Sequence, residues 1–244
     1  PCMGSHGGAT PEGQLQVLRS LGVTETSVGA PVVSSLDVVE LGVNSFGSPV
    51  FVARDLVAAD ATIVVNRIKP HTDFSGEIGS GIVKMLAVGM GKQRGADEAH
   101  RLCLRHGFPA VLEDLAGVVL ARLPVLAAVA IIEDQLDQTA LVERLDTSHG
   151  LPGLLPREIE LQRLAAGLMP RLPFDDLDVL IVDLLGKEVS GAGMDPNVIG
   201  RRASPWFGSP PKPRITRIYA RGLTDASGGN ALGVGMADFV HRRL

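Results

Sequence analysis

Apolar residues along this chain follow two periods, that of a helix and that of a strand. From Pro11 to Leu21 leucines recur three residues apart, with a candidate N-cap at Thr10 and a glycine at position 22, so a helix is expected there. From Thr62 to Val65 the apolar run is short, continuous and rich in β-branched residues, which predicts a buried strand.

The later part of the chain continues this alternation. The same signals predict a polar turn over residues 55–60, a glycine-rich loop over residues 89–95, and helices over residues 96–106 and 156–169. Prolines at positions 170 and 173 mark a linker, and the apolar run 177–186 then predicts the first strand of a second unit.

Composition agrees with an α/β chain. Aromatic residues make up only 4% of the sequence, and 29 glycines can supply tight connections. We therefore expect two α/β domains with mixed or parallel sheets, over residues 1–172 and 173–244, each taken to be incomplete at its outer end. The active site is expected in the cleft between the domains.

The charge balance argues against nucleic acid as a partner. Lys and Arg number 23 against 27 Asp and Glu, so the net charge of −4 offers no basic field to a polyanion. The most apolar segment, Val118 to Ile132, contains Arg122 and Pro124 and is shorter than a bilayer requires. Two cysteines provide no disulfide framework. We expect a cytoplasmic protein with no membrane partner.

Lys84 lies in an apolar run, "SGIVKMLAVGMG", where a solvated lysine would have polar neighbours. Desolvation lowers the pKa of an amine, and a neutral amine is a nucleophile, so Lys84 is a candidate for covalent attachment of a cofactor. The alternative is an apolar stem that lets the amine reach water. In the loop before it, Ser75, Gly76 and Gly81 are candidate cofactor contacts, since glycine permits close approach of the backbone.

Three histidines are candidates for proton transfer or metal binding. His6 precedes the first expected helix and His71 follows the expected strand, and the two could form an acid–base pair if their loops meet. His100, within the expected helix 96–106, could bind nickel, zinc, copper or iron. Cys103 lies one turn further on and could reach the same metal, or could simply be buried.

Taken in order, His6, His71, Lys84 and His100 resemble a known constellation. They match the two catalytic histidines, the cofactor lysine and the metal histidine of the nickel-pincer lactate racemases and their uncharacterised homologues. The resemblance covers essentially the whole chain and rests on "GSHGGATPEGQLQVLRSLGV", on "KPHTDFSG" and "SGIVK", and on the sixteen residues from Lys84 to His100. It implies an isomerase, namely a nickel-dependent racemase or epimerase of 2-hydroxy acids.

The resemblance also implies a cofactor. A pyridinium-3-thioamide-5-thiocarboxylic acid mononucleotide would be attached through a thioamide to Lys84 and hold nickel by one carbon and two sulfurs, with His100 as the fourth ligand. One of His6 and His71 would remove the substrate hydroxyl proton while the C2 hydride moves to the cofactor. Return of the hydride from the other face inverts C2. Proteins that synthesise the cofactor are the implied partners.

A second block, "GKEVSGAGMDPNVIGR", resembles a homologue branch rather than the lactate enzyme. Asn197 and Arg201 are the candidate cofactor contacts in it, with Lys187 in reserve, and a turn after Pro196 is the alternative for Asn197. The loop before Lys84 is longer than in the lactate enzyme, which leaves larger hydroxy acids and sugar acids open as substrates. The family's substrate-binding arginine lies upstream of the position of His6 and is absent here.

Two other functions stay open on the residues alone. One is a zinc or iron enzyme that uses His6, His71 and His100, with Lys84 as an electrostatic group. The other is a non-catalytic module that binds an anion or a nucleotide in the glycine-rich loop. The sequence gives no indication of the oligomeric state.

Overall fold

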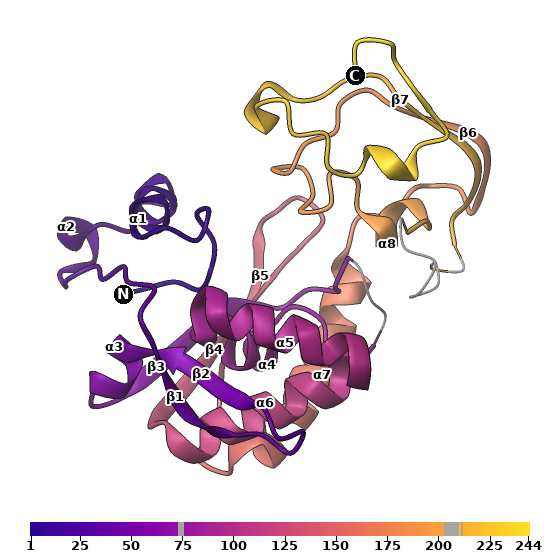
Figure 1. Cartoon of the computed structure of the whole chain (residues 1–244). Coiled ribbons are helices and arrows are strands. Elements are labelled where there is room, and N and C mark those ends of the chain that lie inside the picture. Colours follow the sequence, from indigo (N-terminus) through magenta and orange to yellow (C-terminus); the bar gives the residue numbers. More distant parts are fainter. Residues whose placement is uncertain (73–75, 203–209, 211) are drawn as a thin grey trace. The chain divides into compact units, whose positions relative to one another are not determined.

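The structure, a computed structural model, describes residues 1–72, 76–202, 210 and 212–244 (Figure 1). The chain divides into two compact units. The first comprises Pro1–Lys69, Gly76–Glu133 and Thr139–Ala165, and the second comprises Pro70–Ser75, Asp134–Gln138 and Ala166–Leu244.

The first unit contains two small sheets. Strands β1 (Val38–Val43) and β2 (Pro49–Ala53) form an antiparallel pair. The other sheet has the order β3 (Thr62–Arg67), β4 (Val125–Glu133) and β5 (Thr139–Leu145). Because β3 and β4 are parallel whereas β4 and β5 are antiparallel, this sheet is mixed.

Helices α3 (Arg54–Ala58), α4 (Ile82–Ala87), α5 (Lys92–His106) and α6 (Phe108–Arg122) pack beside these strands (Figure 1). Thr10 caps α1, where its hydroxyl accepts a hydrogen bond from the Gly13 N–H at 3.1 Å, as the sequence predicted. The buried faces of α4 and α6 supply much of the core, including Ile82, Leu86 and Leu112. The bounds are α1 Pro11–Ser20, α2 Glu25–Val28, α3 Arg54–Ala58, α4 Ile82–Ala87, η1 Gly89–Gly91, α5 Lys92–His106, α6 Phe108–Arg122 and α7 Gly150–Leu168.

The second unit is built on a parallel sheet. Its strands are β6 (Asp176–Val182), β7 (Arg214–Ala220) and the short β8 (Phe239–Val240). Short helical turns connect them, namely α8 Pro196–Ile199, η3 Asp225–Ser227 and η4 Val234–Met236. A separate core holds these elements together, with Leu185, Ile218 and Met236 at its centre. The expected α/β class, with mixed and parallel sheets, is therefore confirmed.

Three local predictions need correction. The strand at Thr62 exists, but it is not buried on both faces, because Ile63 and Val65 are 59% and 54% exposed. The polar turn at residues 55–60 begins as helix α3. The loop expected over residues 89–95 is instead η1 followed by the start of α5. Its glycines allow close packing: a Cβ on Gly91 or Gly95 would lie 2.9 or 3.4 Å from the backbone oxygen of Phe51.

The length and the apolar character of its helices bear on whether the chain could cross a membrane. Among the residues that the structure describes, no helix combines the length and the apolar character needed to cross a bilayer.

A buried carboxylate fixes the start of α4. Glu158 on α7 is fully buried, and its carboxylate accepts hydrogen bonds from the Val83 N–H at 3.0 and 3.3 Å and from the Ile82 N–H. Burial raises the pKa of Glu158 to about 7, although these backbone bonds oppose the shift. The carboxylate thus supplies acceptors that the first turn of a helix lacks.

We expect this carboxylate to make the first unit less stable as the pH rises. Its folded-state pKa of about 7 exceeds the ordinary 4.5, so the stabilising contribution is complete below pH 4.5 and is lost as the pH rises through 7. Glu158→Gln removes this dependence. Relative to the native chain, the variant should gain about 3 kcal/mol between pH 4.5 and pH 8, by the usual conversion of a pKa shift.

Urea denaturation at several pH values measures this difference. Glu160→Gln on the same helix is the matched control, because the side chain of Glu160 is 59% exposed and pairs with Arg157. A constant difference between the native chain and Glu158→Gln across this pH range would contradict the prediction.

Candidate functional site

His6 lies on an exposed turn before α1. The segment that precedes it lies against η1: a Cβ on Gly4 would be 3.3 Å from the Gly89 Cα. Because η1 directly follows α4, this contact brings the His6 segment next to the end of the helix that carries Lys84. The two candidates therefore lie in one region of the first unit.

Lys84 lies on the less buried side of α4. Ile82, Val83 and Leu86 on the same helix are at most 1% exposed and face the core, whereas Lys84 is only partly buried. The apolar neighbours in sequence are thus explained by the packing of α4. Burial raises the pKa of the Cys103 thiol on α5, and the charge of Lys84 opposes this shift, in agreement with a position of Lys84 near α5.

Cys103 carries a buried thiol. It is 5% exposed, and burial raises its pKa to about 11, with the charge of Lys84 opposing that shift. Burial thus favours the protonated form of this thiol. No group of three or more metal-ligating side chains occurs among the described residues.

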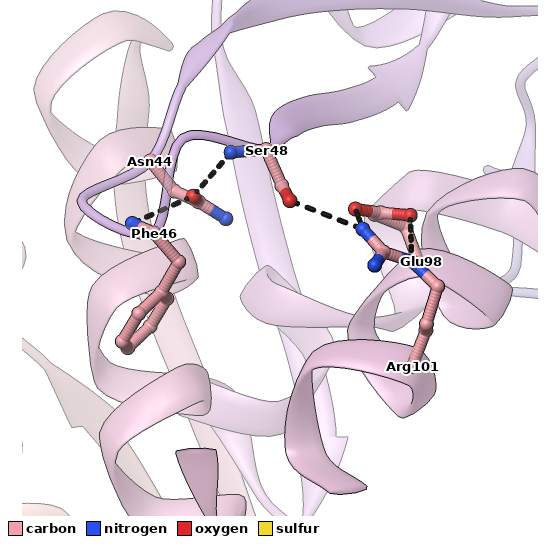
Figure 2. A network of polar contacts seen from close by, with 5 residues as sticks. All are labelled: Asn44, Phe46, Ser48, Glu98 and Arg101. Carbon is pink, nitrogen blue, oxygen red and sulfur yellow. Dashed lines mark hydrogen bonds and ion pairs between the residues drawn. The ribbon is translucent and has the colours of Figure 1, made fainter. Parts of the chain in front are cut away.

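His100 lies on the exposed face of α5, one turn before Cys103. A polar network fixes this part of the helix, as Figure 2 shows. Arg101 donates from Nη2 to the Ser48 Oγ at 3.2 Å and from Nε to Glu98 at 3.0 Å. The turn between β1 and β2 is in turn closed by Asn44, whose Oδ1 accepts from the Ser48 N–H at 2.9 Å.

The glycines before Lys84 have different surroundings. Gly81 is buried against Glu158, because a Cβ there would collide with the carboxylate. Its carbonyl accepts from Asn66 Nδ2 at 2.7 Å. Gly76 is exposed, and a Cβ there would find its nearest neighbours at 3.9 Å. The predicted contact at Ser75 lies outside the described residues. Cofactor binding at these positions stays a prediction.

His71 belongs to the second unit, where α8 and the residues after it hold its backbone. Asn197 donates from Nδ2 to the His71 carbonyl at 3.1 Å. Arg202 donates from Nε to the Thr72 carbonyl at 3.3 Å and from Nη2 to Asn197 Oδ1 at 3.1 Å. Asn197, chosen from sequence as a cofactor contact, therefore orients the segment that carries His71.

Arg201 faces a different part of the second unit. Its guanidinium pairs with Asp238 at 2.6 Å and donates to the carbonyls of Met236 and Ile215 at 3.0 and 2.8 Å. These contacts join η4 to β7, so they stabilise the unit. The neighbouring Arg202, not Arg201, contacts the His71 segment, and the sequence offered no signal to separate two consecutive arginines.

Lys92 is a further residue that sequence reasoning missed. It was assigned to a loop, whereas the structure places it at the first position of α5 with only 2% of its surface exposed. Its ammonium donates to the Met3 carbonyl at 2.5 Å, three residues before His6. A lysine between the glycines "GMGKQRG" looked like a surface residue, and only the packing reveals its burial.

The structure thus gathers the candidates into two sets. His6, Lys84 and His100 belong to the first unit, together with the missed Lys92. His71 and Asn197 belong to the second unit, together with the missed Arg202.

Comparison with solved structures relates this fold to a known protein. The lactate racemase apoprotein from Thermoanaerobacterium thermosaccharolyticum matches with a TM-score of 0.53 at 13% identity, over 85% of this chain and 49% of that chain. This chain therefore spans about half the length of the racemase. No family model matches the sequence, and no curated protein sequence matches it. The likeness at this identity concerns the fold, and this chain has an α/β fold similar to that of the lactate racemase apoprotein.

Proposed function

We propose that this protein is a racemase or epimerase that inverts C2 of a 2-hydroxy acid with a nickel-pincer nucleotide bound to Lys84. One observation supports this most directly. The segment that ends in His6 packs on η1, and η1 joins the helix of Lys84 to the helix of His100. The candidate anchor and the candidate metal ligand thus lie on helices joined by η1, and the segment of a candidate proton-transfer group packs on η1.

The residues of the first unit fit such a group. The Lys84 side chain lies on the less buried side of α4, where an amine can accept a covalent partner without disturbing the core. His100 is exposed on α5 and can offer an imidazole nitrogen, which suits nickel. A pincer group brings its own remaining donors, so one protein ligand suffices.

When bound, the nucleotide would supply a hydride acceptor, a capacity that no protein side chain has. His6 and His71 would take and return the proton of the substrate hydroxyl oxygen, because neutral imidazole is a base near physiological pH. Asn197 and Arg202 would orient His71 through its backbone.

The substrate class is a 2-hydroxy acid larger than lactate or a sugar acid. This choice rests on the thirteen positions from His71 to Lys84 and on Glu77 within them, which differ from the lactate enzyme's loop. In the structure Glu77 pairs with Arg163 on α7. Proteins that make the cofactor are the proposed partners, and cytoplasm is the proposed location.

We expect covalent loading at Lys84. When the protein is expressed with the cofactor-biosynthesis proteins, the peptide that contains Lys84 should gain the mass of one nucleotide, because the lysine amine can form the thioamide. The loaded protein should also bind one nickel per chain. Intact-mass spectrometry, peptide mapping and metal analysis measure both. Lys84→Arg should abolish the mass gain, whereas Lys212→Arg, a surface residue paired with Asp175, should retain it.

The other outcomes separate the competing functions. Zinc or iron without added mass would favour a simple metal enzyme. Unmodified, metal-free protein that still binds nucleotides or anions would favour a non-catalytic module.

We also expect both histidines to be needed for inversion. Starting from one enantiomer of each candidate acid, His6→Ala and His71→Ala should each slow conversion to the other enantiomer by about 10²- to 10⁴-fold, the usual contribution of a general acid or base. Chiral chromatography measures this conversion. His149→Ala is the control, since His149 is exposed and its ring lies within hydrogen-bond distance of Asp146 and Ser148, away from the candidate residues in sequence. Full activity in either of the first two variants would contradict the assignment.

A further inference from the structure

Lys92 is a nearly fully buried lysine that the proposed chemistry does not use. Lysine is seldom buried to this degree unless it is paired. Its ammonium donates to the Met3 carbonyl at 2.5 Å and lies 3.4 Å from Gln14 Oε1. Burial lowers the pKa of Lys92, while the nearby Cys2 and Asp55 raise it. The ammonium is thus held by the backbone carbonyl of a residue 89 positions earlier in the chain.

The backbone of Lys92 is strained. Its φ of 53° and ψ of −152° lie where a residue with a side chain is uncommon. Glycine would occupy this position without strain, and the chain already has a glycine at position 91. With lysine at this position the backbone is strained, and the side chain makes the contacts with Met3 and Gln14.

The side chain of Lys92 holds the segment that leads to His6. Met3 and Gly4 offer consecutive carbonyls, and the second accepts from Gln14 Nε2 at 2.5 Å. Gln14, on α1, is fully buried. Two buried side chains from different helices thus fix two carbonyls of a segment that has no secondary structure of its own.

We propose that Lys92 is the positioning residue of His6. Its ammonium holds the Met3–Gly4 backbone against the start of α5, and it thereby sets where the exposed His6 imidazole lies relative to Lys84. This inference deepens the proposed function, on which the catalytic role of His6 rests. The anchoring itself is a property of the folded chain and can be tested without cofactor.

Backbone order parameters from ¹⁵N relaxation test the anchor in the cofactor-free chain. In the native protein the amides of Gly4–Gly8 should be rigid, at about 0.85, and in Lys92→Met, which keeps an apolar stem and removes the ammonium, they should fall below about 0.6. Values in α5 and α6 should not change. Lys92→Gly should loosen the same amides even though it relieves the backbone strain.

Two comparisons make this test specific. Asp137→Gly also removes a positive φ, of 58°, in the turn between β4 and β5, and should leave Gly4–Gly8 rigid. Gln14→Met removes the other anchor and should loosen the segment as Lys92→Met does. The proposal is overturned if Gly4–Gly8 is already flexible in the native chain, or stays rigid in the Lys92 variants. Should those variants not fold, Lys92→Gln, which also removes the ammonium, provides the same test, and a rigid Gly4–Gly8 segment in it would overturn the proposal.

Kinetics of the loaded enzyme separate positioning from simple stability. Lys92→Met should lower kcat for C2 inversion by roughly 10- to 100-fold with little change in KM, because a misplaced acid–base group impairs the reaction more than binding. Lys92→Arg, which keeps a cationic donor, should recover part of kcat. A segment that is rigid in the native chain and loosens in Lys92→Met, together with a loaded native enzyme that inverts no substrate, would refute the function and keep the anchor. Unchanged kcat in Lys92→Met, with His6 essential, would refute the anchor and keep the function.

Discussion

The position of Lys84 depends on one buried contact, that of the Glu158 carboxylate with the first turn of α4. A helix of six residues is too short to be stable by itself, and its first N–H groups have no acceptors within the helix. Glu158 supplies these acceptors from α7, and its negative charge faces the positive end of the helix dipole. Desolvation of the carboxylate opposes this gain, as its raised pKa shows. Gln162, one turn further along α7, extends the same attachment by donating to the Ser80 carbonyl at 3.0 Å.

Glycine in this chain serves close packing as much as it serves turns. Gly81 leaves room for the Glu158 carboxylate, and Gly91 and Gly95 let the start of α5 lie on the backbone of β2. Gly4 allows the N-terminal segment to lie on η1 in the same way. A glycine-rich stretch between apolar runs indicates a loop only if nothing approaches it closely. Which group approaches a glycine depends on the tertiary structure and cannot be read from the local sequence. For this reason the loop predicted over residues 89–95 was wrong.

Local signals predicted the fold class and several elements correctly. The cap at Thr10 and the leucine spacing after it identify α1, and Gly107, with a φ of 83°, ends α5 as expected. For the site, the sequence singled out Lys84 and His100, which the structure places on successive helices of one unit. It missed Lys92 and Arg202, because both act on backbone carbonyls of residues far away in sequence. Nothing in local composition reports such partners.

These missed residues share one physical role. His6 and His71 both lie on segments without regular secondary structure, and ordering such a segment costs conformational entropy. In each unit, long polar side chains offset this cost by donating to carbonyls at or near the histidine: Lys92 and Gln14 in the first, Asn197 and Arg202 in the second. A carbonyl anchor fixes the backbone of each segment without using the side chain of the histidine. The proton transfer proposed for both histidines depends on such a fixed position.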